Sequence, residues 1–420
     1  MKNFQATAAL LCLVTMSAMA YGQAVETDGF LNSGAGKRFP LGTYDMPETD
    51  EELAQLAAAG FNVVRCGSRA ELDRLAAAGM QGIISLSMQE GLTDAMKARI
   101  AEVADHPAIA AWEGPDEVVW NFTAFSGLHR TMGIHKHSGE WWLQTPEAIA
   151  YAEQQAAVIM PNMRAVAEHI RATDLLKRPV WINEAQRSDA YYVRQYLDFV
   201  SITGCDVYPV KKATRDLQRI GQSVAWWNGV GEGKSVWMVL QNFSWHELGE
   251  YYAETEVAYP TFAESRFMAY DSIARGARGI LYWGGRFCKS GPFKSSVNAV
   301  VHELNALQPF LVAPNAPEPE LRVHELTDAF PVSHVYMAAK RVGDDWLIIV
   351  VNEDNAVHSA VEIAGLASLE GRRFYELYGN EERAVTRGAI MTRLMGFQAK
   401  VYVTDRRFEV ENRGGRDFVE

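Results

Sequence analysis

Eight short apolar segments alternate with helix-like segments between residues 39 and 283. Strands that alternate with helices are typical of parallel sheets, and eight such units in about 250 residues are what a (β/α)8 TIM barrel requires. The alternative is an open doubly wound sheet, which is disfavoured because no glycine-rich phosphate turn follows the first strand. The expected strands are 39–45, 61–66, 80–87, 108–112, 178–183, 202–209, 235–241 and 279–283.

The chain has 420 residues, which is too long for one ordinary core, so two domains are expected. Residues 25–313 would form the barrel, and the proline-rich residues 314–320 would form a linker. From residue 321 the pattern changes to short alternating strands separated by turn signals. This pattern predicts an antiparallel β-sandwich over residues 321–411. The polar residues 412–420 are expected to be a flexible tail.

The N-terminus has the pattern of a secretory signal peptide over residues 1–24. Lys2 supplies the positive end, residues 6–16 are apolar, and residues 18–20 provide a small-residue cleavage site. The apolar run is too short to span a bilayer, and no later segment is apolar for long enough. We therefore expect an exported protein, periplasmic or extracellular, without a membrane span.

Composition argues against several classes of function. The net charge is −12 without a basic tract, which argues against binding to nucleic acid or to anionic membranes. Three cysteines remain after the leader, Cys66, Cys205 and Cys288, and their odd number and spacing indicate buried free thiols. His135 and His137 alone make a poor metal site, so no metal is expected. No cofactor is implied.

Large polar or aromatic residues stand where the predicted strands end. In a barrel these strand ends converge on one mouth, although they are far apart in the sequence. Carboxylates and amides bond hydroxyl groups, and aromatic rings cover the apolar face of a sugar, so a carbohydrate is the expected ligand. The strand-end residues are Asp45, Arg65, Ser87, Asp116 with Glu117, Asn183 with Glu184, Asp206 with Tyr208, Gln241 and Trp283.

This ordered set resembles the large clan of retaining (β/α)8 glycoside hydrolases. The matching residues are Arg65 on the second strand, Glu117 after the fourth, Tyr208 after the sixth and Trp283 on the eighth. Residues 259–283 also resemble a stretch common in uncharacterised bacterial members, and a terminal sandwich is a familiar accompaniment. The resemblance implies hydrolysis of a glycosidic bond, with the acid/base after strand four and the nucleophile after strand seven.

Two positions depart from that clan. The clan has Asn-Glu after strand four, where this chain has Asp116-Glu117, and a nucleophilic Glu after strand seven, where this chain has Gln241. An amide cannot act as a carboxylate nucleophile, so the two-carboxylate retaining mechanism does not apply as normally drawn. The main alternative is therefore a glycan-binding barrel that has lost its nucleophile. A structural surface protein is a second alternative.

Glu117 and Glu184 are the first two catalytic candidates. Glu117 would be the general acid, with its pKa raised by Trp112 and Asp116. The alternative is a structural carboxylate bonded to a neighbouring helix N-terminus. Glu184 would be the base that activates water in an inverting scheme, or else an exposed residue of the rim.

Glu264 is the third candidate, as a replacement nucleophile. Thr261-x-x-Glu264 also matches a capping box at the start of a helix, and we favour that interpretation. Glu247 follows strand seven by a few residues, where a solvated loop is the simpler interpretation. The second catalytic carboxylate is thus left among Glu184, Glu264 and Glu247.

The other strand-end residues are expected to bind substrate. Asp206 and Tyr208 share one face of strand six by the period of two, and Asp206 would orient a hydroxyl or Arg65. Their alternative is an ion pair that fills the barrel, and the alternative for Trp283 as a sugar platform is simply core. The expected substrate-binding residues are Asp45, Arg65, Asp116, Asn183, Asp206, Tyr208, Gln241 and Trp283.

A long insertion follows the fourth strand, over residues 121–146. Long loops in compact domains are usually functional or disordered, and this one is aromatic enough to form an ordered wall of a cleft. Its adjacent Trp141 and Trp142 either form an outer subsite for the glycan or pack the insertion against the barrel.

Overall fold

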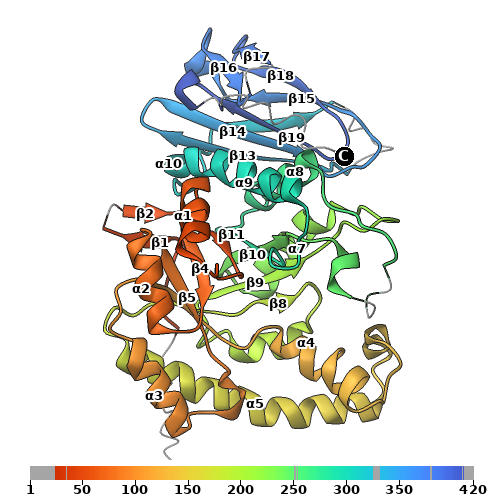
Figure 1. The fold of residues 1–420 in the computed structure, drawn as a ribbon. Helices are drawn as coiled ribbons and strands as arrows, with labels where there is room; N and C mark the ends of the chain where they lie inside the picture. Colours follow the sequence, from red (N-terminus) through yellow and green to blue (C-terminus); the bar gives the residue numbers. More distant parts are fainter. Residues whose placement is uncertain are drawn as a thin grey trace, which may run out of the picture.

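The computed structural model describes residues 24–34, 36–249, 252, 254–324, 332–378, 381–408 and 410. The predicted leader, apart from Ala24, and the predicted tail lie outside the described residues. A parallel sheet closes into a barrel in the middle of the molecule (Figure 1), because β9 pairs with β10, β10 with β11, and β11 with β3. We call its eight strand positions staves; β7 and β8 together form the fifth. The strands of this sheet are β3 (Leu41–Thr43), β4 (Val63–Cys66), β5 (Gln81–Ser85), β6 (Ile109–Glu113), β7 (Val180–Trp181), β8 (Glu184–Ala185), β9 (Ile202–Val207), β10 (Ser235–Gln241) and β11 (Gly279–Trp283).

The predicted (β/α)8 barrel is therefore confirmed, with one irregular stave. The fifth stave is interrupted between β7 and β8, and the backbone carbonyl of Asn183 in the gap accepts a hydrogen bond from the N–H of Glu117 at 2.9 Å. The broken pairing thus connects the fifth stave to the segment that follows β6. The fourth stave also ends one residue later than predicted, at Glu113.

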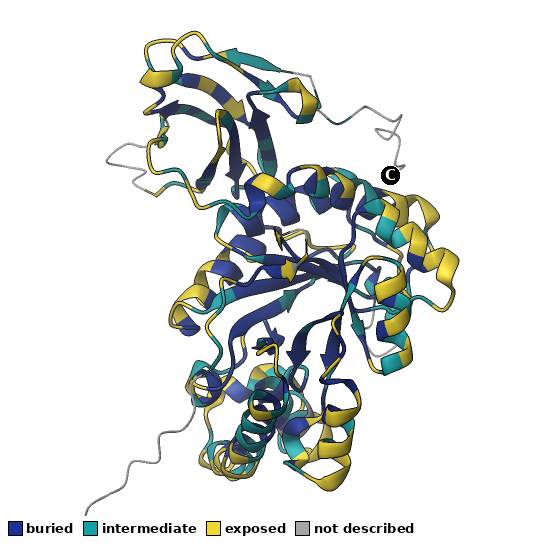
Figure 2. Cartoon of the chain, turned by 90° about the vertical axis from the view of Figure 1, so that its left-hand side faces the viewer, coloured by how far each residue is buried: buried dark blue, intermediate teal, exposed yellow. Residues whose placement is uncertain are grey.

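Helices cover the barrel, and Figure 2 shows their outer faces exposed and the strands buried. Side-chain caps define several helix starts; Thr49 and Glu52 form a capping box on α1, for example. The helices are α1 (Asp50–Ala59), α2 (Arg69–Ala77), α3 (Asp94–Val103), α4 (Val118–Phe122), α5 (Pro146–Thr173), α6 (Ala190–Val193), α7 (Arg219–Val230), α8 (Phe262–Ala274), α9 (Gly291–Ala306) and α10 (Gln308–Leu311). Shorter helical turns are η1 (Met88–Glu90), η2 (Ser126–Thr131), η3 (Ser138–Leu143), η4 (Arg194–Tyr196), η5 (Trp245–Leu248), η7 (Ala367–Leu369) and η8 (Arg406–Phe408).

Large side chains fill the barrel interior. The rings of Trp181 and Trp237 lie with centroids 5.1 Å apart, and the indole N–H of Trp237 donates to the carbonyl of Gly29 at 2.8 Å. Gly29 precedes an antiparallel hairpin of β1 (Leu31–Ser33) and β2 (Gly36–Arg38), and Leu31 of that hairpin packs in the same interior cluster. The hairpin and the two indoles therefore close the barrel as a packed core.

The second domain consists of two antiparallel sheets that enclose their own apolar cluster. The predicted β-sandwich is confirmed, and it lies at the top of Figure 1. One sheet has the order β12-β15-β18 and the other β13-β14-β19-β16-β17. The strands are β12 (Glu320–Val323), β13 (Val335–Val342), β14 (Asp345–Asn352), β15 (Ser359–Ala364), β16 (Arg373–Glu376), β17 (Glu382–Ala384), β18 (Ile390–Leu394) and β19 (Gln398–Val403).

The three cysteines of the described chain are free and buried, as predicted: Cys66, Cys205 and Cys288. The longest helix, α5, contains Pro161 and carries charged side chains along its length. Among the described residues, no helix combines the length and apolar character needed to cross a membrane.

Arg266 joins the two domains through a buried polar network. From α8 its guanidinium donates to Glu303 of α9 at 2.8 Å and to the carbonyl of Ala399 in β19 at 2.8 Å. Tyr270 and Tyr378 donate their hydroxyls to the same Glu303 carboxylate at 2.7 and 2.6 Å. Because Glu303 is fully buried, these donors replace the water that it loses, and the sandwich is bound to the barrel.

A second carboxyl pair lies at the same junction. Asp271 of α8 is close to Glu353 at the end of β14, and burial followed by this neighbouring charge raises the pKa of Asp271 well above its ordinary value. The pKa of Glu353 is also raised, chiefly by burial, although Arg275 opposes the rise. Gly221 of α7 faces both carboxyls, and a side chain there would collide with them.

Removal of the Arg266 side chain should strongly destabilise the protein. Arg266→Ala leaves Glu303 buried without its cation, which typically costs about 3–5 kcal/mol, and Tyr378→Phe should cost about 1–3 kcal/mol by removing one donor. Arg322→Ala, in the half-exposed ion pairs with Glu320 and Glu362, is the control, expected within about 0.5 kcal/mol. Urea unfolding measures all three, and equal losses for Arg266→Ala and Arg322→Ala would contradict the network.

The Asp271–Glu353 pair should make stability fall as pH rises. Its raised pKa values mean that the folded state keeps protons that the unfolded state releases above its ordinary carboxyl pKa, so stability is lost until the folded groups also ionise. Asp271→Asn removes this proton requirement and should reduce the drop in melting temperature between about pH 5 and about pH 8. Asp344→Asn, at an exposed turn, should leave the drop unchanged. An unaltered drop in Asp271→Asn would refute the assignment.

Candidate active site

Glu117 stands at the barrel mouth in an uncommon backbone conformation. It lies between β6 and α4 with φ 49° and ψ 40°, in the left-handed region that residues other than glycine rarely adopt. The hydrogen bond from its N–H to Asn183 holds this turn. Such conformations cluster at functional sites, where the surrounding structure must stabilise them. The side chain is consequently presented by a fixed turn.

The carboxyl groups of Glu117 and Asp206 lie within hydrogen-bonding reach of each other. Burial is the largest cause that raises the pKa of Glu117 well above its ordinary value, followed by the charges of Asp206 and Asp116. Burial and then the charge of Asp116 raise the pKa of Asp206 to about 7, while the neighbouring Tyr208 and Glu117 side chains oppose the rise. Burial and the neighbouring charges therefore favour the protonated form of Glu117, whose pKa is the more strongly raised of the two.

Trp112 does not provide the apolar wall that the sequence led us to expect beside Glu117. Its indole N–H donates to Asp174 at the end of α5 at 2.9 Å, and its ring packs in the layer between the strands and the helices. Successive strand residues alternate between the two faces, so the next residue, Glu113, belongs to the other face. The pKa of Glu117 is instead raised by burial and by neighbouring carboxylates.

Glu113 is a site residue that the sequence analysis missed. It is fully buried and forms an ion pair with Arg65, which also donates to Ser85 at 2.8 Å. Burial raises the pKa of Glu113 to about 7, while Arg65 opposes the rise. Asp206 was expected to orient either a hydroxyl or Arg65, and the ion-pair partner of Arg65 is instead Glu113. The signal was present in the sequence, because a strand that ends at residue 113 rather than 112 includes this carboxylate.

Asp116 and Asn183 are brought together as neighbours at the mouth. The Asn183 amide donates to the Asp116 carboxylate at 2.9 Å. Burial raises the pKa of Asp116, whereas Asn183 and then Arg65 lower it. This contact lies beside the backbone bond from Glu117 to Asn183, so the interrupted fifth stave holds both acidic residues of the Asp116-Glu117 turn.

Glu184 supports the site from below α4. Its carboxylate accepts hydrogen bonds from the backbone N–H of Val119 at 3.1 Å and from the hydroxyl of Ser188 at 2.6 Å. The expected alternative of an exposed rim residue is wrong, because Glu184 is fully buried. Burial raises its pKa to about 7, and these hydrogen bonds oppose the rise. Glu184, rather than Glu117, is thus the structural carboxylate at this helix N-terminus.

Gln241, at the end of β10, forms hydrogen bonds to backbone groups of neighbouring residues. Its side-chain oxygen accepts from the N–H of Val210 at 2.9 Å, and its amide donates to the carbonyls of Val210 at 2.9 Å and Phe243 at 3.0 Å. The residue is fully buried. The amide that replaces the expected nucleophile therefore bonds the segment after β9, and its hydrogen-bonding groups are used within the protein.

Glu264 and Glu247 have structural contacts that account for their carboxylates. Glu264 forms the capping box with Thr261 at the start of α8, as favoured from the sequence, and an ion pair with Arg215. Glu247 forms a capping box on η5 and accepts from Tyr259 and from the backbone N–H of Lys289. These contacts leave neither residue with support as the replacement nucleophile.

Four aromatic rings form one wall of the mouth, and all of them except the buried Phe243 are partly exposed. Tyr208 and Trp283 are stacked, with ring centroids 5.4 Å apart and planes inclined by 22°. Phe243 and Trp245 pack edge-on against Tyr208, with centroids 5.0 and 6.2 Å away. We call Tyr208, Phe243, Trp245 and Trp283 the aromatic wall. Since the charges of Asp206 and Glu117 both act on the Tyr208 hydroxyl, the wall adjoins the Glu117–Asp206 pair.

Asp45 occupies the end of β3 on the same rim. Its carboxylate lies 4.0 Å from the guanidinium of Arg286, and burial is the main cause that raises its pKa. Asp45 is not among the largest causes that shift the pKa of Glu117, so it serves below as a control. In the described part of the chain, no group of three or more histidine, cysteine or acidic residues is arranged to hold a metal ion.

Comparison with known proteins shows the fold. No protein-family model and no curated protein sequence matches the chain. Among solved structures, a GH27 β-L-arabinopyranosidase from Geobacillus stearothermophilus is similar at 10% identity and a TM-score of 0.50, covering 87% of this chain and 96% of that one. Its likeness shows the fold alone, a TIM barrel followed by a C-terminal sheet domain.

Two further neighbours are similar at lower TM-scores. A GH30 endoxylanase from Clostridium papyrosolvens has 12% identity and a TM-score of 0.48, covering 92% of this chain and 98% of that one. A putative α-galactosidase from Bacteroides fragilis has 12% identity and a TM-score of 0.49, with 88% and 79% covered. The neighbours carry different activities, so the comparison identifies no substrate.

Replacement of Asp206 should lower the pKa of Glu117. Asp206→Asn removes the negative neighbour that favours the protonated form, so the pKa of Glu117 should fall by at least about one pH unit. NMR titration of 13C-labelled glutamate carboxyls measures this, with the Glu117 signal assigned by its loss in Glu117→Gln. Asp45→Asn is the matched control and should leave the titration unchanged. An identical Glu117 titration in Asp206→Asn and wild type would exclude this effect of Asp206.

Proposed function

We propose that the protein is an exported glycoside hydrolase that cleaves a glycosidic bond in an oligo- or polysaccharide, with Glu117 as the general acid. The observation that carries the proposal is the placement of Glu117 in a fixed turn after β6, beside Asp206 and Asp116, where burial and these charges raise its pKa. General acids work best when their pKa lies near the operating pH. Glycosidases keep such a proton by burying the carboxyl group, which raises its pKa.

The surroundings of Glu117 suit a carbohydrate substrate. The partly exposed rings of Tyr208, Trp245 and Trp283 offer apolar surface for a sugar ring, as aromatic side chains do in ligand sites. Asp116, Asn183 and Arg65 add polar groups able to bond sugar hydroxyls. Export is supported by the leader-like residues 1–24, which fit a protein that meets glycans outside the cytoplasm.

In this proposal, Glu117 donates its proton to the glycosidic oxygen as the bond from that oxygen to the anomeric carbon breaks. Positive charge then develops on the sugar ring, and the carboxylates of Asp116 and Asp206 stabilise it electrostatically. Water adds to the anomeric carbon, and the proton it releases returns to the Glu117–Asp206 pair. The two products are the sugar hemiacetal and the free hydroxyl of the leaving group.

Asp206 is not assigned as the second carboxylate of a standard scheme, because its carboxyl group interacts directly with that of Glu117. Retaining enzymes use a second carboxylate about 5–5.5 Å from the acid, and inverting enzymes one about 6.5–9.5 Å away. Asp206 therefore acts as a positioning residue that keeps the proton on Glu117. Glu184 has the same kind of role, because it holds the N-terminus of the helix that starts directly after Glu117.

A glycan-binding barrel without hydrolysis is the second candidate. Gln241 favours it, because an amide committed to backbone hydrogen bonds occupies the strand end where the clan resembled by this chain has its nucleophile. Such a protein would use the same aromatic wall and polar rim to hold a sugar chain. The two candidates differ in whether new reducing ends appear when the protein is incubated with glycans.

Glu117→Gln should reduce turnover by about 100-fold or more, since general acid catalysis typically contributes about 10²–10⁴-fold. Its melting temperature should stay close to that of wild type, because the amide retains the shape of the carboxyl group. Purified wild-type protein is screened on a glycan panel, with products and their anomers identified by NMR. Glu264→Gln, at the start of α8, is the control and should remain active.

Two results would overturn the catalytic assignment. One is retained activity in Glu117→Gln together with a large fall in melting temperature, which would make Glu117 a structural residue. The other is binding of a glycan by wild-type protein without release of any product, which would establish the glycan-binding barrel instead.

A further inference from the structure

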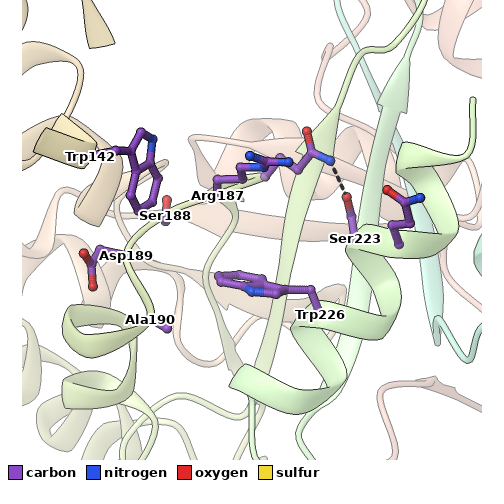
Figure 3. A pocket seen from close by; sticks show the side chains of 9 residues that line it. Trp142, Arg187, Ser188, Asp189, Ala190, Ser223 and Trp226 are labelled. Carbon is purple, nitrogen blue, oxygen red and sulfur yellow. Dashed lines mark hydrogen bonds between the residues drawn. The ribbon is translucent and has the colours of Figure 1, made fainter. Parts of the chain in front are cut away.

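Apart from the barrel mouth, a pocket lies beside the loop that follows β8. Its volume is about 620 Å3, and Figure 3 shows side chains that enter it from different elements. Three segments supply them: η3 in the long insertion, the loop and helix start after β8, and α7. None of its lining residues belongs to the Glu117–Asp206 pair or to the aromatic wall. They are Trp142, Gln186, Arg187, Ser188, Asp189, Ala190, Gln222, Ser223 and Trp226.

Two exposed indoles stand on different sides of this pocket. Trp142 projects from η3 with 50% of its surface exposed, and Trp226 projects from α7 with 38% exposed. Their neighbours in the sequence, Trp141 and Trp227, are buried. Trp141 therefore packs the insertion against the rest of the domain, whereas half of the Trp142 surface is left exposed. Large exposed rings around a hollow are typical of binding sites, because their burial against a ligand recovers apolar surface.

The polar groups of the pocket complement these rings. Gln186 donates to Ser223 at 2.8 Å, which fixes the loop against α7. Asp189 accepts from the indole of Trp141 at 3.3 Å and from the backbone of Tyr191 at 2.9 Å. Arg187 and Asp189 bring charges of opposite sign, so the lining has no strong preference for a charged ligand. Flat rings with both donors and acceptors match a sugar, which has an apolar face and a rim of hydroxyls.

The pocket is also joined to the proposed active site. Ser188 in its lining donates to Glu184 at 2.6 Å, and Glu184 accepts from the N–H of Val119 in α4 at 3.1 Å. Glu117 directly precedes that helix. A ligand in the pocket would therefore lie against the same loop that positions the catalytic turn.

We propose that Trp142 and Trp226 form an accessory carbohydrate-binding subsite, which holds a remote part of a glycan chain whose cleavage site lies at Glu117. This inference rests on the proposed function for the identity of the ligand as a carbohydrate. A separate subsite explains why the insertion carries an exposed indole next to a buried one. It also predicts that long glycans bind more tightly than short ones.

Affinity electrophoresis of the full-length protein tests the subsite. The probes are gels that contain xylan, mixed-linkage β-glucan, galactomannan or polygalacturonate. Wild type should be retarded by at least one of them, and the double variant Trp142→Ala/Trp226→Ala should lose affinity for it by about tenfold or more, as expected when central aromatic contacts are removed. Trp142→Phe/Trp226→Phe should restore part of the affinity. Leu143→Ala, an exposed neighbour outside the lining, is the matched control.

Hydrolysis of a short aryl glycoside separates this test from the test of function. The double alanine variant should retain wild-type activity on a short substrate, whereas Glu117→Gln should lose activity but keep its retardation by the polysaccharide. Wild type that no gel retards would overturn the subsite, whatever its activity on the short substrate. Equal retardation of wild type and the double alanine variant would also overturn it. Retardation without any hydrolysis would support the subsite and contradict the proposed hydrolase alone.

Discussion

The burial of negative charge at the barrel mouth is the constraint on which the site depends. Glu113, Asp116, Glu117, Glu184 and Asp206 all converge there, because the strands that carry them close into one barrel. A buried carboxylate is costly unless a cation, hydrogen-bond donors or a proton compensates it. The protein uses all three kinds of compensation, and each one holds a different carboxyl group of the mouth in place.

Those compensations explain the irregular features of the barrel. Arg65 forms an ion pair with Glu113. The side-chain amide of Asn183 donates to Asp116, and its backbone carbonyl accepts from the N–H of Glu117. The fifth stave is therefore interrupted at the residue that makes these two contacts. Glu184 is bonded by the start of α4. Glu117 and Asp206 lie against each other, and their raised pKa values favour a proton as the compensation. The general acid that we propose is thus a result of the same electrostatic constraint.

The junction with the sandwich follows similar rules. The stretch over residues 259–283, which resembles uncharacterised bacterial barrels, contains Arg266, Tyr270 and Asp271, and the structure places all three at the boundary between the domains. That stretch is therefore explained by domain attachment, while its last residue, Trp283, belongs to the aromatic wall. One βα unit serves both the junction and the mouth.

The sequence by itself determined the barrel, the sandwich and the rim position of Glu117, because strand periodicity and helix signals are local properties. It also pointed to the capping role of Glu264, whose partner Thr261 is three residues away. Only the tertiary structure showed that Glu117 lies beside Asp206, that Arg65 forms its ion pair with Glu113, and that Glu184 is buried under α4. These contacts join residues 48 to 89 positions apart, and spatial closeness across separate staves leaves no pattern in a single sequence. A carboxylate's charge state depends on those neighbours, so the chemistry of the mouth was decided by the fold.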